Sequence, residues 1–380
     1  MCIMCLFIMI PFVKAEENNN TLSPNAKSAI LIEESTGEIL YEYNSHEKQP
    51  PASMTKMMSL LLIMEALEKD VIKWNQVITV SSNASSMGGS QILLETGEKM
   101  SVDDLVKGIA IASGNDAVVA LAEAIAGTEE NFVKMMNDKL IELGLKDSNF
   151  KNCHGLDEEG HYSSAYDMAY IARELVKHKK ILEYSSIYET YLREGTDKKI
   201  WLVNTNKLVR FKSGVDGLKT GYTEGAGFCL TATMKQDNMR VIATVMGEPD
   251  SQTRNNEVSS MLDYAFAQVG LKKVLSKNSV VEKITLSKSK LDEIEIVPIK
   301  DVNVIYKKVE GEITPTYEIK LDDISVPLKK GDVVGILYVM NNDDIINEVD
   351  LTVKEDADKC NLFELYWKYL KNILSGNIKF

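Results

Sequence analysis

The sequence predicts an α+β protein with a larger mixed domain, a small all-β domain and a helical C-terminal end. Strand-like segments near both ends of residues 16–271 enclose a run of helical patterns, which predicts one antiparallel sheet with a block of helices against it. After residue 276 only short strand patterns with turn residues between them occur, which predicts an all-β domain over 276–356. Residues 357–380 have the pattern of an amphipathic helix.

In the first domain, residues 28–34 and 38–43 predict a β-hairpin that turns at Ser35-Thr36-Gly37. Ser, Thr or Glu at the start and Gly after the end are typical helix boundaries. Apolar periodicity predicts helices after Ser53 and over 102–126, 129–143, 164–178 and 255–269. Strand patterns return at about 225–234 and 239–246.

In the second domain, strands are expected where short alternating runs are separated by Gly, Pro or Asn. Residues 272–278 are expected to be the linker between the two domains. The predicted strands are 280–286, 294–297, 302–306, 317–321, 333–339 and 345–353.

Composition narrows the class of protein. The chain has 380 residues, 44% of them hydrophobic and 26% charged, which is ordinary for a globular protein of two domains. Its net charge of −13, without a long basic run, argues against a nucleic-acid partner. Outside the first 15 residues the cysteines are Cys153, Cys229 and Cys360, which are odd in number and widely spaced, so neither a disulfide framework nor a cysteine metal site is implied. We expect the first two to be buried free thiols.

Residues 1–15 resemble a secretory signal peptide that is cut after Ala15. An apolar run over 2–13 leads into Val13-Lys14-Ala15, which is small at its last position, and the polar Glu16-Glu17 follows. The run is too short to span a bilayer comfortably, although an uncleaved anchor is the alternative. No Lys or Arg precedes it, so the true start codon stays open. The segment predicts an exported protein.

The C-terminal segment predicts a membrane-surface helix. Glu364, Lys368, Lys371 and Ser375 fall on one helical stripe, and leucines and aromatic residues fill the rest. Such a helix suits the bilayer interface, where its apolar side lies in the acyl boundary. A terminal helix packed on its own domain is the alternative.

The stretch Pro50-Pro51-Ala52-Ser53-Met54-Thr55-Lys56 precedes a nearly all-apolar helix. Residues three apart share a helix face, so the Lys56 amine is expected beside the Ser53 hydroxyl. A lysine whose pKa is lowered by burial can take the proton of a serine nucleophile. The pattern Ser-x-x-Lys is common, however, and Ser287 and Lys290 form a second match.

Two further motifs follow in order. Ser113-Gly114-Asn115 interrupts an apolar helical pattern, and buried polar residues of this kind either satisfy their own loop or form a site. Lys219-Thr220-Gly221 stands in a strand-like segment, where a lysine and a hydroxyl can hold a carboxylate and Gly221 lets a substrate backbone approach. Each motif alone is weak, but the ordered set is typical of penicillin-recognising serine enzymes.

With these motifs the chain resembles the D-alanyl-D-alanine carboxypeptidases among the low-molecular-weight penicillin-binding proteins. The resemblance covers nearly all of residues 16–380 and includes Gly88-Gly89-Ser90, Asn152-Cys153-His154-Gly155-Leu156 and His161-Tyr162-Ser163. It implies a transpeptidase-like catalytic domain over 16–271, a small β domain, and a C-terminal amphipathic anchor at the extracytoplasmic face of the bacterial cell membrane. It also implies peptidoglycan stem peptides as substrate, β-lactams as covalent inhibitors, and neither cofactor nor metal.

The resemblance also implies residue roles. Ser53 corresponds to the acylated nucleophile, Lys56 to its base, and Ser113 to the residue that passes a proton to the leaving D-alanine. The substrate-binding residues would be Asn115 for the amide and Lys219 and Thr220 for the terminal carboxylate, with Gly221 beside them. The oxyanion hole would be formed by the backbone N–H groups of Ser53 and Tyr222.

Other classes of protein fit less well. A serine β-lactamase is disfavoured because the middle motif is Ser-Gly-Asn and because Glu189-Thr190-Tyr191-Leu192-Arg193 lacks the asparagine of a deacylating Glu-x-x-Leu-Asn. None of the four histidines can be tied to a nucleophile, which disfavours a Ser-His-Asp hydrolase. A metal site at His154, Asp157 and His161 is less expected than a structural loop. A module that is acylated without turnover stays an alternative.

Overall fold

The computed structural model describes residues 22–374. Contacts divide the chain into two compact units. The first holds the chain up to residue 31 with residues 41–233 and 242–261, and the second holds residues 32–40, 234–241 and the chain from 262 onward. The predicted signal peptide over 1–15 lies outside the described residues.

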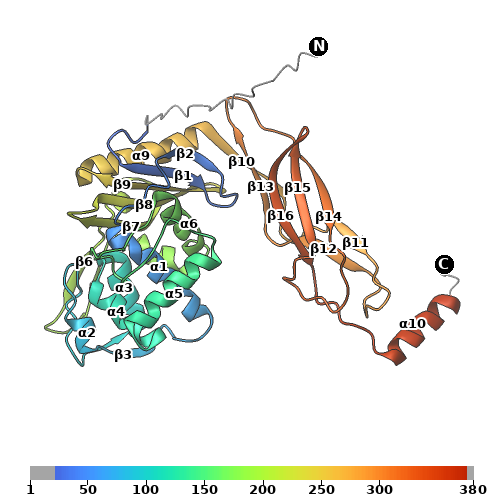
Figure 1. The fold of residues 1–380 in the computed structure, drawn as a ribbon, viewed down its shortest axis with the longest axis horizontal. Coiled ribbons are helices and arrows are strands. Elements are labelled where there is room, and N and C mark those ends of the chain that lie inside the picture. The colour runs from blue at the N-terminus through green and yellow to red at the C-terminus, as the bar shows by residue number, and fades with distance from the viewer. Residues whose placement is uncertain (1–21, 375–380) are drawn as a thin grey trace, which may run out of the picture. The chain divides into compact units, whose positions relative to one another are not determined.

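A five-stranded sheet has the order β2-β1-β9-β8-β7. Its strands are β1 (Ser28–Glu33), β2 (Ile39–Tyr43), β7 (Val215–Thr223), β8 (Gly227–Gln236) and β9 (Met239–Glu248). The predicted N-terminal hairpin is therefore confirmed. Figure 1 shows helix α9 (Ser251–Gln268) on one side of this sheet and the helical block on the other. Strand β7 forms an edge of the sheet, so one side of it is free for a ligand.

The helical block is built around α1 (Lys56–Glu68). Ten of its thirteen residues are buried, because α1 is apolar on nearly all sides and packs against α4, α5 and α6. The other helices of the block are α2 (Ser82–Ser85), α3 (Val102–Ala112), α4 (Asn115–Ala126), α5 (Glu129–Glu142), α6 (Ala165–Leu175), α7 (Lys180–Ser185) and α8 (Leu208–Phe211).

The predicted helix over 102–126 is two helices in the structure. Ser113 has a left-handed backbone (φ 64°) that ends α3, and Gly114 precedes the first turn of α4. The polar motif that interrupts the apolar pattern is therefore the corner between two buried helices. Two small antiparallel strand pairs were not predicted: β3 (Val77–Thr79) with β4 (Lys99–Ser101), and the hairpin of β5 (Glu189–Leu192) with β6 (Ile200–Val203).

The second unit contains the predicted small β structure. Its five-stranded sheet has the order β11-β12-β16-β15-β14, with antiparallel neighbours. The strands are β11 (Glu282–Ile284), β12 (Ile294–Pro298), β14 (Thr316–Leu321), β15 (Gly335–Asn341) and β16 (Asp344–Val353). Alternating Val, Ile and Leu side chains form its core.

The linker predicted over 272–278 is wrong for most of its length. Residues up to Leu275 belong to β10 (Val269–Leu275), which pairs antiparallel with β13 (Val302–Lys307). The partner strand lies about 30 residues further along the chain, and the local sequence of the lysine-rich segment does not predict this pairing.

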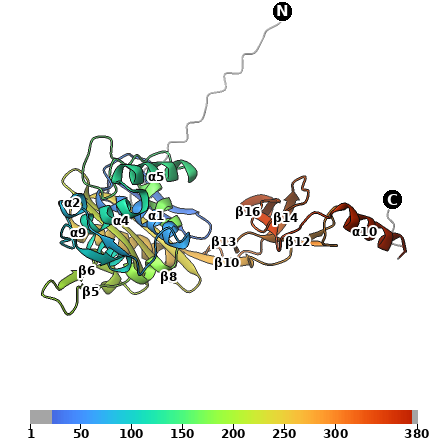
Figure 2. The ribbon, with the colours of Figure 1, turned by 90° about the horizontal axis from the view of Figure 1, so that it is seen from below.

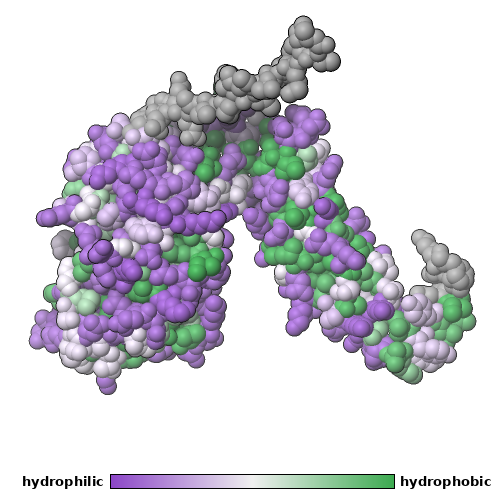
Figure 3. Space-filling model, viewed as in Figure 1, coloured by the Kyte–Doolittle hydropathy of each residue, from purple (hydrophilic) through white to green (hydrophobic). Residues whose placement is uncertain are grey.

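Helix α10 (Leu362–Leu374) matches the predicted C-terminal helix. Its polar side contacts its own unit, because the Lys368 amine donates to the carbonyl groups of Ser289 (2.9 Å) and Leu291 (3.1 Å). Large apolar side chains stay exposed, and Figure 3 shows hydrophobic residues on this surface. Ser375 of the predicted stripe lies outside the described residues. Within 22–374, no helix has the length and apolar character needed to cross a bilayer.

Candidate active site

Ser53 lies in a single 3₁₀ turn, Ala52–Thr55, immediately before α1. The α-helix begins at Lys56, three residues later than the predicted start at Ser53. The spacing still brings the two side chains together, with Lys56 Nζ 3.0 Å from Ser53 Oγ. The prediction of a Ser53–Lys56 pair is therefore met in the structure.

The Lys56 amine is completely buried. It donates a second hydrogen bond to the carbonyl oxygen of His154 at 2.6 Å. Burial lowers the pKa of Lys56 to about 7. With this pKa the Lys56 amine is neutral in a large share of the molecules at neutral pH, so it can accept the proton of Ser53.

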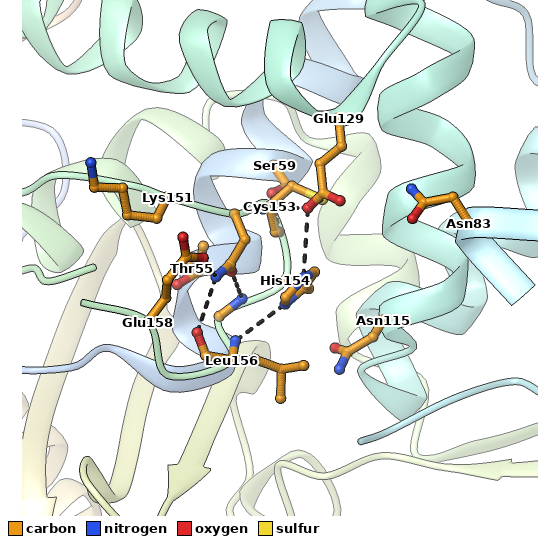
Figure 4. A network of polar contacts seen from close by, with 12 residues as sticks. Thr55, Ser59, Asn83, Asn115, Glu129, Lys151, Cys153, His154, Leu156 and Glu158 are labelled. Carbon is orange, nitrogen blue, oxygen red and sulfur yellow. Dashed lines mark hydrogen bonds and ion pairs between the residues drawn. The ribbon is translucent and has the colours of Figure 1, made fainter. Parts of the chain in front are cut away.

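The loop over 152–156 encloses the base, and Figure 4 shows it against α1. Ser59 Oγ donates to the Cys153 carbonyl at 2.6 Å, and the Asn152 side chain closes the loop through Gly155 N (2.7 Å) and Leu156 O (3.0 Å). The loop thereby presents the His154 carbonyl to Lys56. The loop is therefore part of the site, and its hydrogen bonds to Lys56 and Ser59 were not predicted from the sequence.

The two histidines of this region are buried and contact neighbouring side chains. His161 Nε2 lies 2.8 Å from Thr55 Oγ1. His154 Nε2 lies 3.6 Å from the Glu129 carboxylate, and Figure 4 shows these two side chains facing each other. Burial lowers the pKa of each histidine to about 4, which leaves both neutral at neutral pH. In the part of the chain that the structure describes, no three His, Cys, Asp or Glu residues are grouped to hold a metal ion.

Ser113 and Asn115 flank the corner between α3 and α4. Ser113 Oγ and Asn115 Oδ1 are buried and have no hydrogen-bond partner among residues 22–374. The Asn115 amide nitrogen donates to the carbonyl of Gly88 at 2.7 Å. Buried polar atoms are normally paired, so these two are available for a ligand.

Asp116, which we gave no role from the sequence, holds the neighbouring loop in place. Its buried carboxylate accepts from the backbone N–H groups of Ile92 (3.1 Å), Leu94 (3.0 Å) and Ala117 (2.9 Å). The backbone N–H of Asn115 donates to Ser90 O in the same loop at 2.7 Å. These hydrogen bonds join the loop over residues 90–94 to the corner between α3 and α4.

Strand β7 carries the third motif. Lys219 is buried, and burial first, then the nearby charges of Lys56 and Arg254, lower its pKa well below the usual value. Its amine donates to the Thr220 carbonyl at 3.1 Å. Thr220 Oγ1 lies 2.8 Å from Thr205 Oγ1. Lys219 forms no ion pair with residues 22–374, so an incoming carboxylate would give its amine a negative partner.

Gly221 has a packing role that the sequence did not predict. A β-carbon at this position would lie 2.8 Å from the carbonyl oxygen of Pro51 and 3.1 Å from Ala52 Cβ. The missing side chain therefore lets β7 approach the turn that carries Ser53. This contact brings the nucleophile and the third motif together.

A cavity of about 460 Å³ joins the three motifs. Five of the predicted residues line it, whereas Lys56, Asn115 and Lys219 are buried and are not among the lining residues. The lining residues that the sequence predicted as site residues are Ser53, Ser113, Thr220, Gly221 and Tyr222. The lining residues that were not predicted are Ser90, Val203, Thr205, Lys207, Phe228, Ser251, Arg254 and Asn255.

Apart from Ser90, which belongs to the stretch Gly88-Gly89-Ser90, these additional residues come from segments without a quoted motif. Ser251, Arg254 and Asn255 lie on α9, and the Phe228 ring on β8 packs at a tilt against the Tyr222 ring with centroids 4.3 Å apart. Only the folding of α9 over the sheet brings Arg254 to the cavity, and no local pattern indicates it.

Comparison with known proteins agrees with this geometry. Residues 14–250 match the family model described as D-alanyl-D-alanine carboxypeptidase, peptidase S11. Residues 270–359 match the model described as the C-terminal domain of penicillin-binding protein 5. The first match covers the region that holds the mixed sheet and the helical block, and the second covers the all-β region.

Two curated relatives are similar over almost the whole chain. D-alanyl-D-alanine carboxypeptidase DacF of Bacillus subtilis is 49% identical over 96% of this chain and 93% of its own length. D-alanyl-D-alanine carboxypeptidase DacC of Escherichia coli is 32% identical over 96% of this chain and 92% of its own length.

Solved structures show the same fold. Penicillin-binding protein 5 from Haemophilus influenzae is 31% identical, covers 88% of this chain and 98% of its own, and superposes with a TM-score of 0.73. Penicillin-binding protein D2 from Listeria monocytogenes, in a cefotaxime-bound form, is 29% identical over 64% of this chain and 97% of its own, with a TM-score of 0.58. The fold, the ordered motifs and these matches establish that the chain belongs to the D-alanyl-D-alanine carboxypeptidase family of penicillin-binding serine peptidases.

Proposed function

We propose that this protein removes the terminal D-alanine from peptidoglycan stem pentapeptides through an acyl-enzyme on Ser53. As a member of its family it is a hydrolase, a serine-type D-Ala-D-Ala carboxypeptidase. The observation that carries the assignment of Ser53 is its 3.0 Å contact with the amine of Lys56, a buried lysine with a pKa of about 7. The second Ser-x-x-Lys match lacks such a base, because the Lys290 side chain is partly exposed and faces Asp358 and Glu364.

In the acylation step, Lys56 takes the proton of Ser53 Oγ as the oxygen attacks the carbonyl carbon of the penultimate D-alanine. The carbonyl oxygen becomes negatively charged and is stabilised by the backbone N–H groups of Ser53 and Tyr222, an interaction worth about 3 kcal/mol per donor. Ser113 relays a proton to the leaving nitrogen, and the peptide bond breaks. Its unpartnered hydroxyl in the cavity wall supports this role.

The substrate is held at both sides of the scissile bond. Lys219 and Thr220 bind the terminal carboxylate, and Asn115 uses its free Oδ1 to accept from the substrate amide. Water then attacks the carbonyl carbon of the acyl-enzyme while Lys56 takes one of its protons, and that proton passes to Ser53 Oγ as the ester bond breaks. The product is a peptide shortened by one D-alanine, with Ser53 restored.

β-Lactams are proposed to acylate the same serine. The relative from Listeria monocytogenes was solved with cefotaxime and with ampicillin bound. A β-lactam presents a carbonyl carbon and a carboxylate, which suit Ser53 and the pair Lys219 and Thr220 respectively.

The protein is proposed to be exported and to lie peripherally at the extracytoplasmic face of the cell membrane. The pattern of a signal peptide over 1–15 and the exposed apolar side of α10 support this location. The lysine side of α10 is held by its own unit, which leaves the aromatic and leucine side for the acyl boundary.

The proposal is tested by D-alanine release from a pentapeptide that ends in D-Ala-D-Ala. We expect release by the native protein and none by Ser53→Ala, whereas Ser287→Ala, in the second Ser-x-x-Lys match, keeps native activity. Full activity of Ser53→Ala would show that the nucleophile is misassigned. A stable penicillin adduct on Ser53 without D-alanine release would instead indicate a module that is acylated without turnover.

A further inference from the structure

Asp157 presents a carboxylate beside the last residue of strand β7. Its Oδ1 accepts a hydrogen bond from the Thr223 hydroxyl at 2.8 Å. Its Oδ2 lies next to Gly225, where a β-carbon would come within 3.1 Å of that oxygen. The Asp157 side chain is exposed, and no basic residue among residues 22–374 forms an ion pair with it. The end of β7 therefore carries a negative charge that is held in place and open to a ligand.

The loop that carries Asp157 runs along the catalytic site. Gly155 packs directly on the turn of the nucleophile. The next residue, Leu156, lies beside Gly89, where a β-carbon would be 3.5 Å from the Leu156 side chain and 2.8 Å from the Asn115 amide nitrogen. Figure 4 shows the Leu156 side chain extending from the loop toward Asn115. The loop thus leads from the nucleophile, past the residue assigned to the substrate amide, to Asp157.

The opposite end of the cavity faces the leaving D-alanine. Val203 and Thr205 line the cavity beside Thr220, and the hydroxyl groups of the two threonines are 2.8 Å apart. In the proposed function Thr220 binds the terminal carboxylate. Val203 ends the β5–β6 hairpin, which Figure 2 shows projecting from the catalytic unit. The part of the substrate upstream of the cleaved bond therefore lies away from this hairpin.

Strand β7 gives the direction in which the substrate extends. In the proposed function the carboxylate lies at Thr220 and the scissile carbonyl oxygen at the N–H of Tyr222. Followed upstream, the peptide therefore runs along the free edge of β7 toward Thr223. A residue of an extended peptide advances about 3.3 Å, as does a residue of the strand. The residue that precedes D-Ala-D-Ala is thus level with Thr223, the hydrogen-bond partner of Asp157.

We propose that Asp157 recognises a side-chain ammonium group, as on a diamino acid, on the residue that precedes D-Ala-D-Ala in the stem peptide. The inference rests on the proposed function, because it names the group that the same site accepts upstream of the cleaved bond. An ammonium group and a carboxylate form a charge-assisted hydrogen bond. Exposed carboxylates at Glu158, Glu159 and Glu224 add to the negative potential around Asp157 and disfavour an anionic side chain.

Asp157 can also serve only as a structural partner that holds the end of β7 through Thr223. That role would affect the processing of every substrate alike. Charge recognition instead acts only on substrates that carry the ammonium group, and salt weakens it because the pair is exposed. Removing the charge from either partner therefore separates the two roles.

The experiment measures kcat/KM for a peptide that ends in lysyl-D-Ala-D-Ala, with its α-amine blocked, and for the same peptide with the lysine side chain acetylated. We expect the native protein to prefer the free amine about two- to fivefold at low salt, and Asp157→Asn to lose this preference, mainly through KM. Asparagine keeps an oxygen that accepts from Thr223, so the substitution removes the charge and not the hydrogen bond. The native preference should also shrink in about 0.5 M salt.

The matched control is Asp70→Asn. Asp70 is also exposed, and it follows the far end of α1, about 20 Å along the helix from Lys56. Its left-handed backbone (φ 56°) suits asparagine as well as aspartate. The substitution removes the same charge from the same unit, and it should leave the preference as in the native protein.

The inference is overturned if the native protein treats both peptides alike, or if Asp157→Asn changes both values by the same factor. Release of D-alanine from neither peptide would refute the proposed function. In that case, calorimetric binding of the two peptides decides the inference. It stands if the native protein binds the free-amine peptide more tightly and Asp157→Asn does not, and it falls with any other result.

Discussion

Gly155 lies so close to Ala52 that a β-carbon on Gly155 would overlap the Ala52 carbonyl group. Gly155 also has a left-handed backbone (φ +90°), and Ala52 is the residue before Ser53. The loop that encloses Lys56 is therefore packed directly on the turn that carries the nucleophile.

This packing predicts that Gly155→Ala slows acylation of Ser53 at least tenfold and lowers stability by more than the roughly 1 kcal/mol of a left-handed alanine. The measurement is the rate of acylation by a penicillin, together with urea unfolding. Gly127→Ala is the matched control, because Gly127 has φ +82° and open space around it. Equal effects of the two substitutions would contradict the proposed packing role.

The pKa of Lys56 predicts a pH dependence. Only the neutral amine can take a proton, so the acylation rate should rise about tenfold per pH unit below 7 and level off above it. His154 and His161, with pKa values of about 4, are already neutral throughout this range. Acylation by a penicillin, followed from pH 5.5 to 9, checks this. A flat or falling profile through pH 7 would exclude Lys56 as the base.

Two buried carboxyl groups predict a pH-dependent stability. Burial first, then the neighbouring Glu257, raises the pKa of Glu248 to about 9, and both Glu248 oxygens lack a hydrogen-bond partner among residues 22–374. The folded protein favours the protonated form, so the contribution of Glu248 to the free energy of unfolding is greatest below the unfolded pKa of about 4.5 and falls as the pH rises toward 9. Asp250 and Arg254 also act on this carboxyl.

Glu248→Gln should therefore stabilise the protein more at pH 8 than at pH 5, by up to about 4 kcal/mol over these three pH units. Urea unfolding at the two pH values measures the difference. The exposed Glu47→Gln variant should show none. An equal effect of Glu248→Gln at both pH values would mean that the carboxyl does not titrate in this way.

The exposed side of α10 predicts membrane binding by the C-terminal segment. A chain that ends at Glu355 should stay in solution when the full-length protein sediments with anionic lipid vesicles. Phe363→Glu in the intact helix should weaken sedimentation, because it places a charge among the exposed apolar residues. Continued sedimentation of the truncated chain would place the membrane contact elsewhere.

Much of the fold could be predicted from local patterns. The N-terminal hairpin, the buried helix after Ser53 and the strands of the second unit each show the periodicity of their element, because burial of one face imposes that period. The break at Ser113 and the pairing of β10 with β13 could not be predicted in the same way. They depend on a left-handed residue and on a partner strand about 30 residues away.

The sequence by itself determined the family, through its three ordered motifs. It also determined the Ser53–Lys56 pair, because one helical turn brings residues three apart together. Only the tertiary structure decided the environment of that pair: the burial that lowers the pKa of Lys56, the contact of Gly221 with Pro51, and the arrival of Arg254 at the cavity. Burial and close packing join segments far apart in the chain. The lowered pKa of Lys56 and the lining of the cavity therefore exist only once the chain has folded.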